Sequence, residues 1–316
     1  MSDPGWRASD ILPRDRTADP LPLSFAQQRL WFLDQLEPHS PFYNMPTALR
    51  LTGLLDLAAL HRSLDTVVAR HEALRTTFPA ENGKPRQVVL PPASVPIPIV
   101  PVPPAGVVSE ETVLRLATEE AAQPFDLARG PLLRARLLRV GPDEHLLMLV
   151  IHHIVSDGWS SSVLYRELSE CYRAYHLGES PRLPELPIQY ADYAVWQQAW
   201  LQGERLERQL GYWQAQLAGV PPVLDLPADR PRPAVQSYRG AREGKLFSDD
   251  LFRGLTALGR QEHATLFMVL LAAFHVLLAR YTGRRDIVVG APIAGRTNVK
   301  IEGLIGLFVN TLAFRS

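Results

Sequence analysis

Two adjacent histidines that are followed closely by an Asp-Gly pair form the segment with the clearest chemical potential. In IHHIVSDGWSSS, residues 151–162, His152 and His153 precede Asp157 and Gly158 in an HHxxxDG pattern. An ordinary imidazole has a pKa of about 6.5, so a neutral histidine is available to accept a proton at pH 7. The pattern therefore points to proton transfer.

The apolar run around the histidines predicts how they are held. HLLMLVIHH, residues 145–153, is nearly all apolar before the pair and predicts a strand buried on both faces. Because neighbouring strand residues face opposite sides, one of His152 and His153 is expected to face a cleft and the other to pack behind it. The same divergence disfavours a metal site. Packing alone, without chemistry, is the alternative at this point.

The residues after the histidines predict a turn and then a helix. Asp157 and Gly158 form an Asp-Gly turn, and Ser160 and Ser161 are expected to cap a helix that ends before Gly178. The free N–H groups and positive dipole end of this helix would stabilise a developing oxyanion. DGWSSS lacks the G-x-S-x-G pattern, so serine hydrolase chemistry is not indicated.

The composition excludes several classes of function. Lys+Arg and Asp+Glu both number 33, which gives a formal net charge of zero and no electrostatic footprint for nucleic acid. The single cysteine, Cys171, excludes an intramolecular disulfide framework and a cysteine-based metal site. No apolar run approaches the ~18–20 residues of a membrane span, and the N-terminus lacks the apolar stretch of a signal peptide. We expect a cytoplasmic protein that binds neither nucleic acid nor membrane.

Proline-rich segments divide the 316 residues into two halves. PRLPELP at 181–187 and VPPVLDLPADRPRP at 220–233 bracket a helical block, which indicates a crossover. Helices and strands alternate on both sides of it, which predicts an α/β (α+β) chain with about two lobes. The expected elements used below are helices after Ser24 and Asp56, strands at 134–140 and 145–153, a buried helix at 265–281, and strands at 286–292 and 307–314.

Four further segments, in order along the chain, accompany the histidine motif. They are LSFAQQRLWFL (23–33), RHEALRTTF (70–78), YADYAVW (190–196) and IGLFVNT (305–311), and PFDLARGPLLRARL (124–137) precedes the histidine strand. Together with HHIVSDG they resemble the ordered motifs of the condensation domains of nonribosomal peptide synthetases, relatives of chloramphenicol acetyltransferase. The resemblance extends over residues 23–311.

The resemblance implies a fold of two chloramphenicol-acetyltransferase-like lobes that form a V with an active-site tunnel between them. Residues 1–19 would be a flexible lead, 20–180 the N-terminal lobe with the HHxxxDG motif, and 181–316 the crossover and a partial C-terminal lobe. The family's sixth and seventh motifs do not follow the fifth here. We therefore expect the second lobe to be incomplete.

The resemblance also implies a role for each residue of the motif. His153 matches the catalytic position, where it would orient the attacking amine and collect its proton, and His152 would pack behind it. Asp157 would be structural and pair with an arginine from the other lobe, for which Arg296 in APIAGR is the expected candidate. Gly158 would offer its backbone N–H and leave room for a thioester. Tyr190, at helical spacing in the crossover, is expected to pack between the lobes.

The implied partners are a donor and an acceptor peptidyl carrier protein, with an adjacent adenylation domain in a full synthetase. The donor would bring an acyl or peptidyl thioester, and the amine of the acceptor's aminoacyl group would attack it. No cofactor or metal would be bound directly, because the carrier proteins supply the 4′-phosphopantetheine arm.

Other readings of the same motifs compete with amide formation. An epimerisation domain and a free-standing acyltransferase share HHxxxDG, although the remaining motifs look more like the condensing type. The heterocyclising relative replaces the histidines with aspartates, so HHIVSDG argues against it. The non-enzymatic alternative is a truncated, non-catalytic remnant or docking scaffold that keeps the motif by descent.

Overall fold

The computed structural model describes residues 10–14, 20–100, 109–141, 143–231, 233–234, 240–241 and 243–316. They fall into two compact units: residues 1–205 with 294–310, the first unit, and residues 206–293 with 311–316, the second unit. The expected flexible lead, residues 1–19, lies outside the described residues except for 10–14. The expected lobe division at residue 180 stays a prediction.

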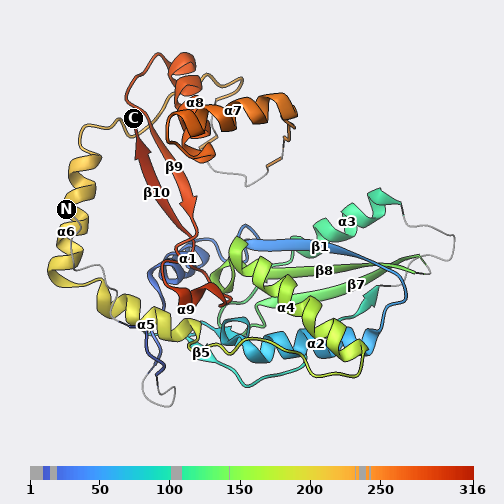
Figure 1. The fold of residues 1–316 in the computed structure, drawn as a ribbon. Coiled ribbons are helices and arrows are strands. Elements are labelled where there is room, and N and C mark those ends of the chain that lie inside the picture. The colour runs from blue at the N-terminus through green and yellow to red at the C-terminus, as the bar shows by residue number, and fades with distance from the viewer. Residues whose placement is uncertain are drawn as a thin grey trace. The chain divides into compact units, whose positions relative to one another are not determined.

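A four-stranded sheet forms the centre of the first unit (Figure 1). Its order is β1 (Asn44–Thr52), β8 (Glu144–His152), β7 (Leu133–Gly141) and β6 (Ile99–Val100). β8 is antiparallel to β1 and β7, and β6 runs parallel to β7. From Leu146 onward every residue of β8 is buried, as its apolar run predicts.

Three helices cover the two faces of this sheet: α2 (Leu57–Arg70), α3 (Glu110–Ala121) and α4 (Gly158–His176). α2 and α4 lie together on one face, and α3 lies on the other (Figure 1). Leu147 and Leu149 of β8 belong to the main core, whereas Leu146 and Met148 pack with α3 in a smaller cluster. This alternation follows from the two-residue period of a strand.

Polar caps begin the helices around the histidine segment. α1 (Phe25–Leu36) starts with a capping box at Ser24, and Asp56 caps α2. The expectation of a serine cap for α4 was wrong: the helix begins at Gly158 and its N-cap is Asp157. The reason is that the Asp157 carboxylate accepts the amide of Ser160 at 2.8 Å.

Short elements complete the first unit. They are η2 (Glu72–Arg75), β2 (Thr76–Thr77), β3 (Ala80–Glu81), β4 (Lys84–Pro85), β5 (Val88–Val89), η3 (His153–Val155), α5 (Tyr190–Trp200) and α9 (Val299–Glu302). β2 pairs with β5 and β3 pairs with β4, each over two residues.

The second unit is built mainly of helices. It contains most of α6 (Gly203–Gln216), with α7 (Asp249–Gln261), α8 (Leu266–Thr282) and the two-stranded sheet of β9 (Val288–Ile293) and β10 (Asn310–Arg315). α8 confirms the helix expected at 265–281, but its expected burial was wrong. Only Leu278 of α8 is buried, because the described part of this unit offers few packing partners besides α7.

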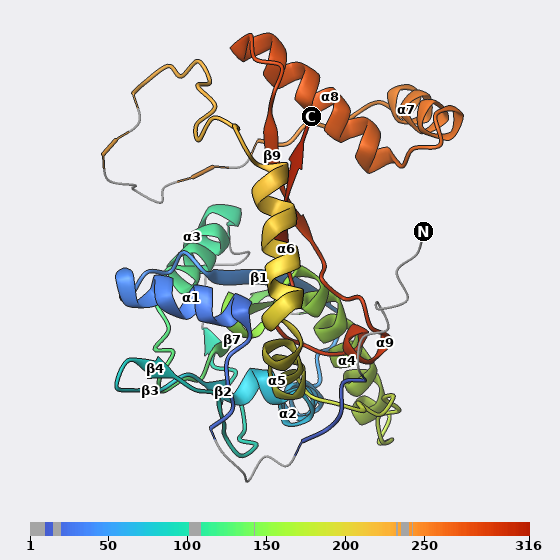
Figure 2. The ribbon, with the colours of Figure 1, turned by 90° about the vertical axis from the view of Figure 1, so that its left-hand side faces the viewer.

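The expected strand at 307–314 begins three residues later, at Asn310. Residues 307–309 are not part of a strand, because backbone groups of these residues bond to side chains of the first unit, as described below. Within the described ranges no single helix is long and apolar enough to cross a membrane. α7 and α8 pass that test only as a pair bent by 104° (Figure 2).

Candidate functional site

The two histidines are separated by the end of β8 rather than by strand alternation. His152 is the last residue of the strand, and His153 is the first residue of η3. The expectation that both belong to the strand was therefore wrong for His153. The backbone amide of His153 still donates to the carbonyl of Tyr43 at 2.8 Å, so the turn stays attached to the sheet edge.

His152 is buried and neutral. Its Nδ1 accepts the amide of Ile154 at 3.1 Å, and its ring meets the rings of Tyr43 and Phe125 edge-on, with centroids 6.4 and 6.0 Å away. Burial, and secondly the neighbouring His153, lower the pKa of His152 to about 4. Its surroundings are those of a packing residue.

His153 is half-buried, and its contacts define which nitrogen carries the proton. Nδ1 lies 2.7 Å from the carbonyl oxygen of Ser156. A carbonyl oxygen only accepts, so Nδ1 carries a proton and donates it. In the neutral ring Nε2 then has a free lone pair, and no partner of Nε2 occurs among the residues that the structure describes. His153 is therefore oriented to accept a proton at Nε2.

The carboxylate of Asp157 collects donors from three directions. Oδ1 accepts from the amide and hydroxyl of Ser160 at 2.8 and 2.7 Å and from Nη2 of Arg296 at 3.2 Å. Oδ2 accepts from the amides of Phe308 and Val309 at 2.9 and 3.2 Å. Charges of this kind are tolerated in an interior only when they are paired and hydrogen-bonded, and this carboxylate is both.

Arg296, the expected partner of Asp157, is in contact with it, and both side chains are almost fully buried, at 1% and 2% exposure. The guanidinium also donates to the carbonyls of Ile301 and Leu304. Its carbon lies 4.1 Å from the centre of the Phe308 ring. By its contacts the stretch 294–310, which contains Arg296, packs within the first unit together with Asp157.

Gly158 stands at the open side of this cluster. It is the first residue of α4, it is exposed, and a Cβ added there would meet no atom within 4 Å. Its amide is one of the first-turn N–H groups that a helix leaves without an internal acceptor. Space and a free donor are therefore present beside His153 in the sequence.

Ser160 and Tyr190 contribute more than the sequence indicated. Ser160 was expected only to cap, but its Oγ accepts from Arg296 Nη2 at 2.8 Å and from the Gly306 amide at 3.1 Å. The hydroxyl of Tyr190 donates to the carbonyl of Leu307 at 2.6 Å and lies 2.8 Å from Ser24 Oγ. Burial raises the pKa of Tyr190 well above its usual value, so the phenol keeps this proton. A polar residue three positions after the capping Asp157 was the available signal for Ser160.

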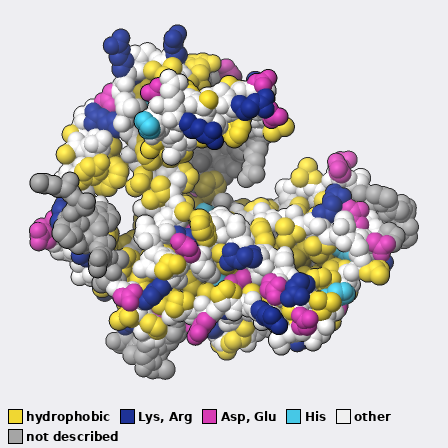
Figure 3. All heavy atoms as spheres, viewed as in Figure 1, with side chains coloured by type: hydrophobic (Ala, Val, Ile, Leu, Met, Phe, Trp, Pro, Cys, Tyr) yellow, Lys and Arg dark blue, Asp and Glu magenta, His cyan; other side chains and the backbone are white. Residues whose placement is uncertain are grey.

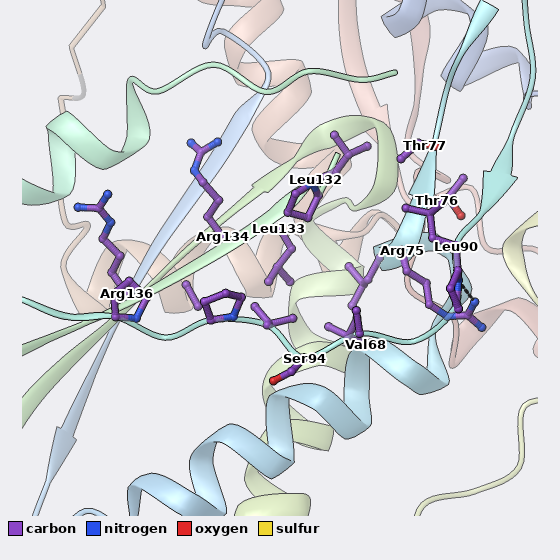
Figure 4. A pocket seen from close by; sticks show the side chains of 18 of the residues that line it. Val68, Arg75, Thr76, Thr77, Leu90, Ser94, Leu132, Leu133, Arg134 and Arg136 are labelled. Carbon is purple, nitrogen blue, oxygen red and sulfur yellow. Dashed lines mark hydrogen bonds between the residues drawn. The ribbon is translucent and has the colours of Figure 1, made fainter. Parts of the chain in front are cut away.

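A cavity of about 440 Å³ in the first unit lies apart from the histidines (Figure 4). It is lined by β7, the end of α2 and residues 90–98, including Pro96 and Pro98. Prolines have no N–H to offer a strand edge, and the Leu137 amide reaches this stretch only at the Pro98 carbonyl, at 3.0 Å. Its lining is mostly apolar and contains neither His152 nor His153.

Comparison with known proteins gives the family. A family model described as a condensation domain matches residues 17–316. The chain belongs to the condensation-domain family. This confirms the resemblance drawn from the ordered motifs.

Curated relatives of this condensation domain are large synthetases. A linear gramicidin synthase of Brevibacillus parabrevis is 52% identical over 297 residues, which are 94% of this chain and 6% of that protein. Phosphinothricin tripeptide synthetase of Streptomyces viridochromogenes is 46% identical over 308 residues, 96% of this chain and 28% of that protein. The chain therefore spans only a small part of the relatives it matches.

Solved structures confirm the mixed α/β fold of the family. The X-domain from teicoplanin biosynthesis is similar with a TM-score of 0.86 and 32% identity, over 98% of this chain and 68% of that one. The first condensation domain of the CDA synthetase is similar with a TM-score of 0.77 and 26% identity, over 94% and 71%. On the face in Figure 3, Lys and Arg side chains are interspersed with Asp and Glu, in keeping with the formal net charge of zero.

Replacing Asp157 tests the carboxylate cluster. We expect Asp157→Ala to lower the free energy of unfolding by about 3–5 kcal/mol, because Arg296 stays buried without a counter-charge and two amides lose their acceptor. Denaturant unfolding followed by tryptophan fluorescence measures it. Glu119→Ala is the matched control, since it breaks an exposed pair with Arg115 and is expected to cost at most about 1 kcal/mol. Equal losses in the two variants would contradict the assignment.

Burial of a neutral His152 predicts a pH-dependent stability. The unfolded chain binds a proton at this residue below about pH 6.5, whereas the folded chain binds it only near pH 4. The free energy of unfolding should therefore fall as the pH drops from about 6.5 to 4, by about 3 kcal/mol from this residue. His152→Asn keeps an acceptor for Ile154 and does not titrate. Unfolding at pH 7 and 4.5 should show a shallower pH dependence in the variant, and identical slopes would sink the prediction.

Proposed function

We propose that this condensation domain forms an amide bond between two carrier-bound substrates and that His153 is its catalytic base. The observation that carries the proposal is the geometry of His153, whose Nδ1 proton is held by the Ser156 carbonyl at 2.7 Å and whose Nε2 is left to accept a proton. Membership of the family and the synthetase relatives support the reaction class.

The proposed reaction transfers an acyl group from sulfur to nitrogen. The amine of the acceptor's aminoacyl group attacks the carbonyl carbon of the donor thioester, a C–N bond forms, and the carbonyl oxygen becomes an oxyanion. Nε2 of His153 takes one proton from the ammonium of the adduct. The adduct then collapses, the C–S bond breaks, and the thiolate leaves and takes up the proton, so that the products are an amide and a thiol.

The start of α4 supports the negative charge in this scheme. The Gly158 amide is unpaired within the helix and lies at the positive end of its dipole, which favours an oxyanion. The open space over Gly158 leaves room for the thioester. His152, Asp157 and Arg296 then act as structural support for the site.

The substrates require partners that bring them. A donor and an acceptor carrier protein would each supply a 4′-phosphopantetheine arm, and an adenylation domain would load the acceptor. A four-domain nonribosomal peptide synthetase solved with AMP and glycine contains a part similar to this chain, with a TM-score of 0.81 and 28% identity. The domain itself would bind no cofactor. Such assembly also supports a cytoplasmic location.

A docking module is a second candidate, and one observation favours it. The X-domain from teicoplanin biosynthesis, solved in complex with OxyB, is similar to this chain with a TM-score of 0.83 and 32% identity. A chain that served only to bind a partner would keep that partner after loss of His153. The assay below separates the two functions.

The test is transfer of acyl mass between carriers. Intact-protein mass spectrometry should show an acceptor carrier gaining the donor's acyl mass in the presence of this chain. His153→Ala should lower the rate by about 10²–10⁴-fold, the usual contribution of a positioned base. His61→Ala, a histidine on α2 outside the site, is the matched control and should transfer normally. A folded chain that transfers nothing would overturn the catalytic proposal, and an epimerisation domain would leave the acceptor mass unchanged.

The pH response of His153→Ala tests what the histidine does. A free α-amine has a pKa of about 7.7–8.0, so its unprotonated fraction rises roughly fivefold between pH 7 and 8. If proton removal limits the variant, its transfer rate should rise by about that factor. A flat response would show that His153 acts by positioning instead.

A further inference from the structure

A second buried histidine, His71, lies outside the HHxxxDG segment and has no part in the proposed reaction. It follows the last residue of α2, precedes η2 and is 1% exposed. It belongs to RHEALRTTF, the motif at 70–78 to which no function was attached above. Its two ring nitrogens contact two different parts of the first unit.

The first contact is with the buried carboxylate of Glu167 on α4. His71 Nε2 lies 2.8 Å from Glu167 Oε2, and Arg70 Nε lies 3.2 Å from the same oxygen. Burial alone would raise the pKa of Glu167, but the contacts with His71 and Arg70 lower it. Because an ionised carboxylate can only accept, His71 Nε2 carries the proton.

The second contact is with the backbone before β10. The amide of Ile305 points at His71 Nδ1 from 3.3 Å. An amide can only donate, so Nδ1 is the acceptor and carries no proton. The two contacts together specify one neutral tautomer of His71, protonated at Nε2.

Ile305 belongs to a buried stretch, residues 303–309, that joins α9 to β10 without regular secondary structure. Its backbone groups therefore depend on side chains for partners. Ser160 holds Gly306, Tyr190 holds Leu307, and Asp157 holds Phe308 and Val309, so the partner of Ile305 is one of a continuous series.

We propose that His71 is a positioning residue, which holds the Ile305 amide and thereby keeps residues 303–309 against the start of α4. This inference deepens the proposed function, because the same stretch supplies two of the donors on Asp157 beside the Asp-Gly turn. His71 acts through the backbone and does not touch the reacting atoms. Its acceptor nitrogen, not its proton, carries the role.

Two substitutions separate the two sides of the ring. In His71→Asn the amide oxygen takes the place of Nδ1, so the Ile305 acceptor is kept and the donor to Glu167 is lost. In His71→Gln the amide nitrogen takes the place of Nε2, so the donor is kept and the acceptor is lost. Arg70 still contacts Glu167 in both variants. Each variant loses one buried hydrogen bond, so a purely structural role predicts equal effects.

Hydrogen exchange of the Ile305 amide, followed by mass spectrometry on the full chain, is the first measurement. His71→Gln should exchange about tenfold faster than the wild type, as expected for one lost hydrogen bond, and His71→Asn should stay within about threefold. His61→Asn and His61→Gln, on the same helix, are the controls and should leave this amide unchanged. Unchanged exchange in His71→Gln, or equal exchange in both His71 variants, would overturn the proposal.

Acyl transfer is the second measurement. The rate at saturating carriers should fall about tenfold in His71→Gln, with KM unchanged, and stay within about threefold of the wild type in His71→Asn. Equal losses in both variants would overturn a positioning role. If the wild type transfers nothing, the proposed function fails, whereas the exchange result still decides the role of His71.

The ring itself can be observed in the unmodified protein. Nitrogen-15 NMR of the histidine side chains should show His71 protonated at Nε2 and unprotonated at Nδ1 at pH 7. A proton on Nδ1 would overturn the proposal without any variant, so that poor folding of a substituted chain does not protect it.

Discussion

The buried carboxylate of Asp157 is the constraint on which the rest of the site depends. It needs a counter-charge and several donors to exist in the interior at all. Arg296, Phe308 and Val309 supply them from 139 to 152 residues further along the chain. Satisfying one side chain therefore ties together the start of α4, the turn around Arg296 and the residues before β10.

The orientation of His153 follows from the same carboxylate. Ser156, whose carbonyl receives the Nδ1 proton of His153, is the residue immediately before Asp157. A cap that fixes Asp157 at the start of α4 also fixes the peptide group ahead of it. The backbone thus selects the tautomer with a free Nε2, and no additional acidic side chain is needed for that purpose.

Much of this arrangement is predictable from sequence, because its elements have local causes. The apolar run before His152 predicts the buried strand, and the ordered motifs predict the family and the pairing of Asp157 with Arg296. What could not be predicted depends on distant partners. The strand ends before His153, and β10 starts at Asn310, because side chains elsewhere bind the intervening backbone. Likewise, only the folded chain shows that His71 faces Ile305.

The burial of His152 has a consequence for its neighbour. Two adjacent imidazoles oppose each other's protonation, and the nearby His153 contributes to the lowered pKa of His152. Because burial keeps His152 neutral above about pH 4, a proton that reaches His153 near pH 7 does not meet a second positive charge. Packing one histidine deeply is therefore also a way of leaving the other free to accept a proton, and the paired sequence HH assigns the two tasks by depth alone.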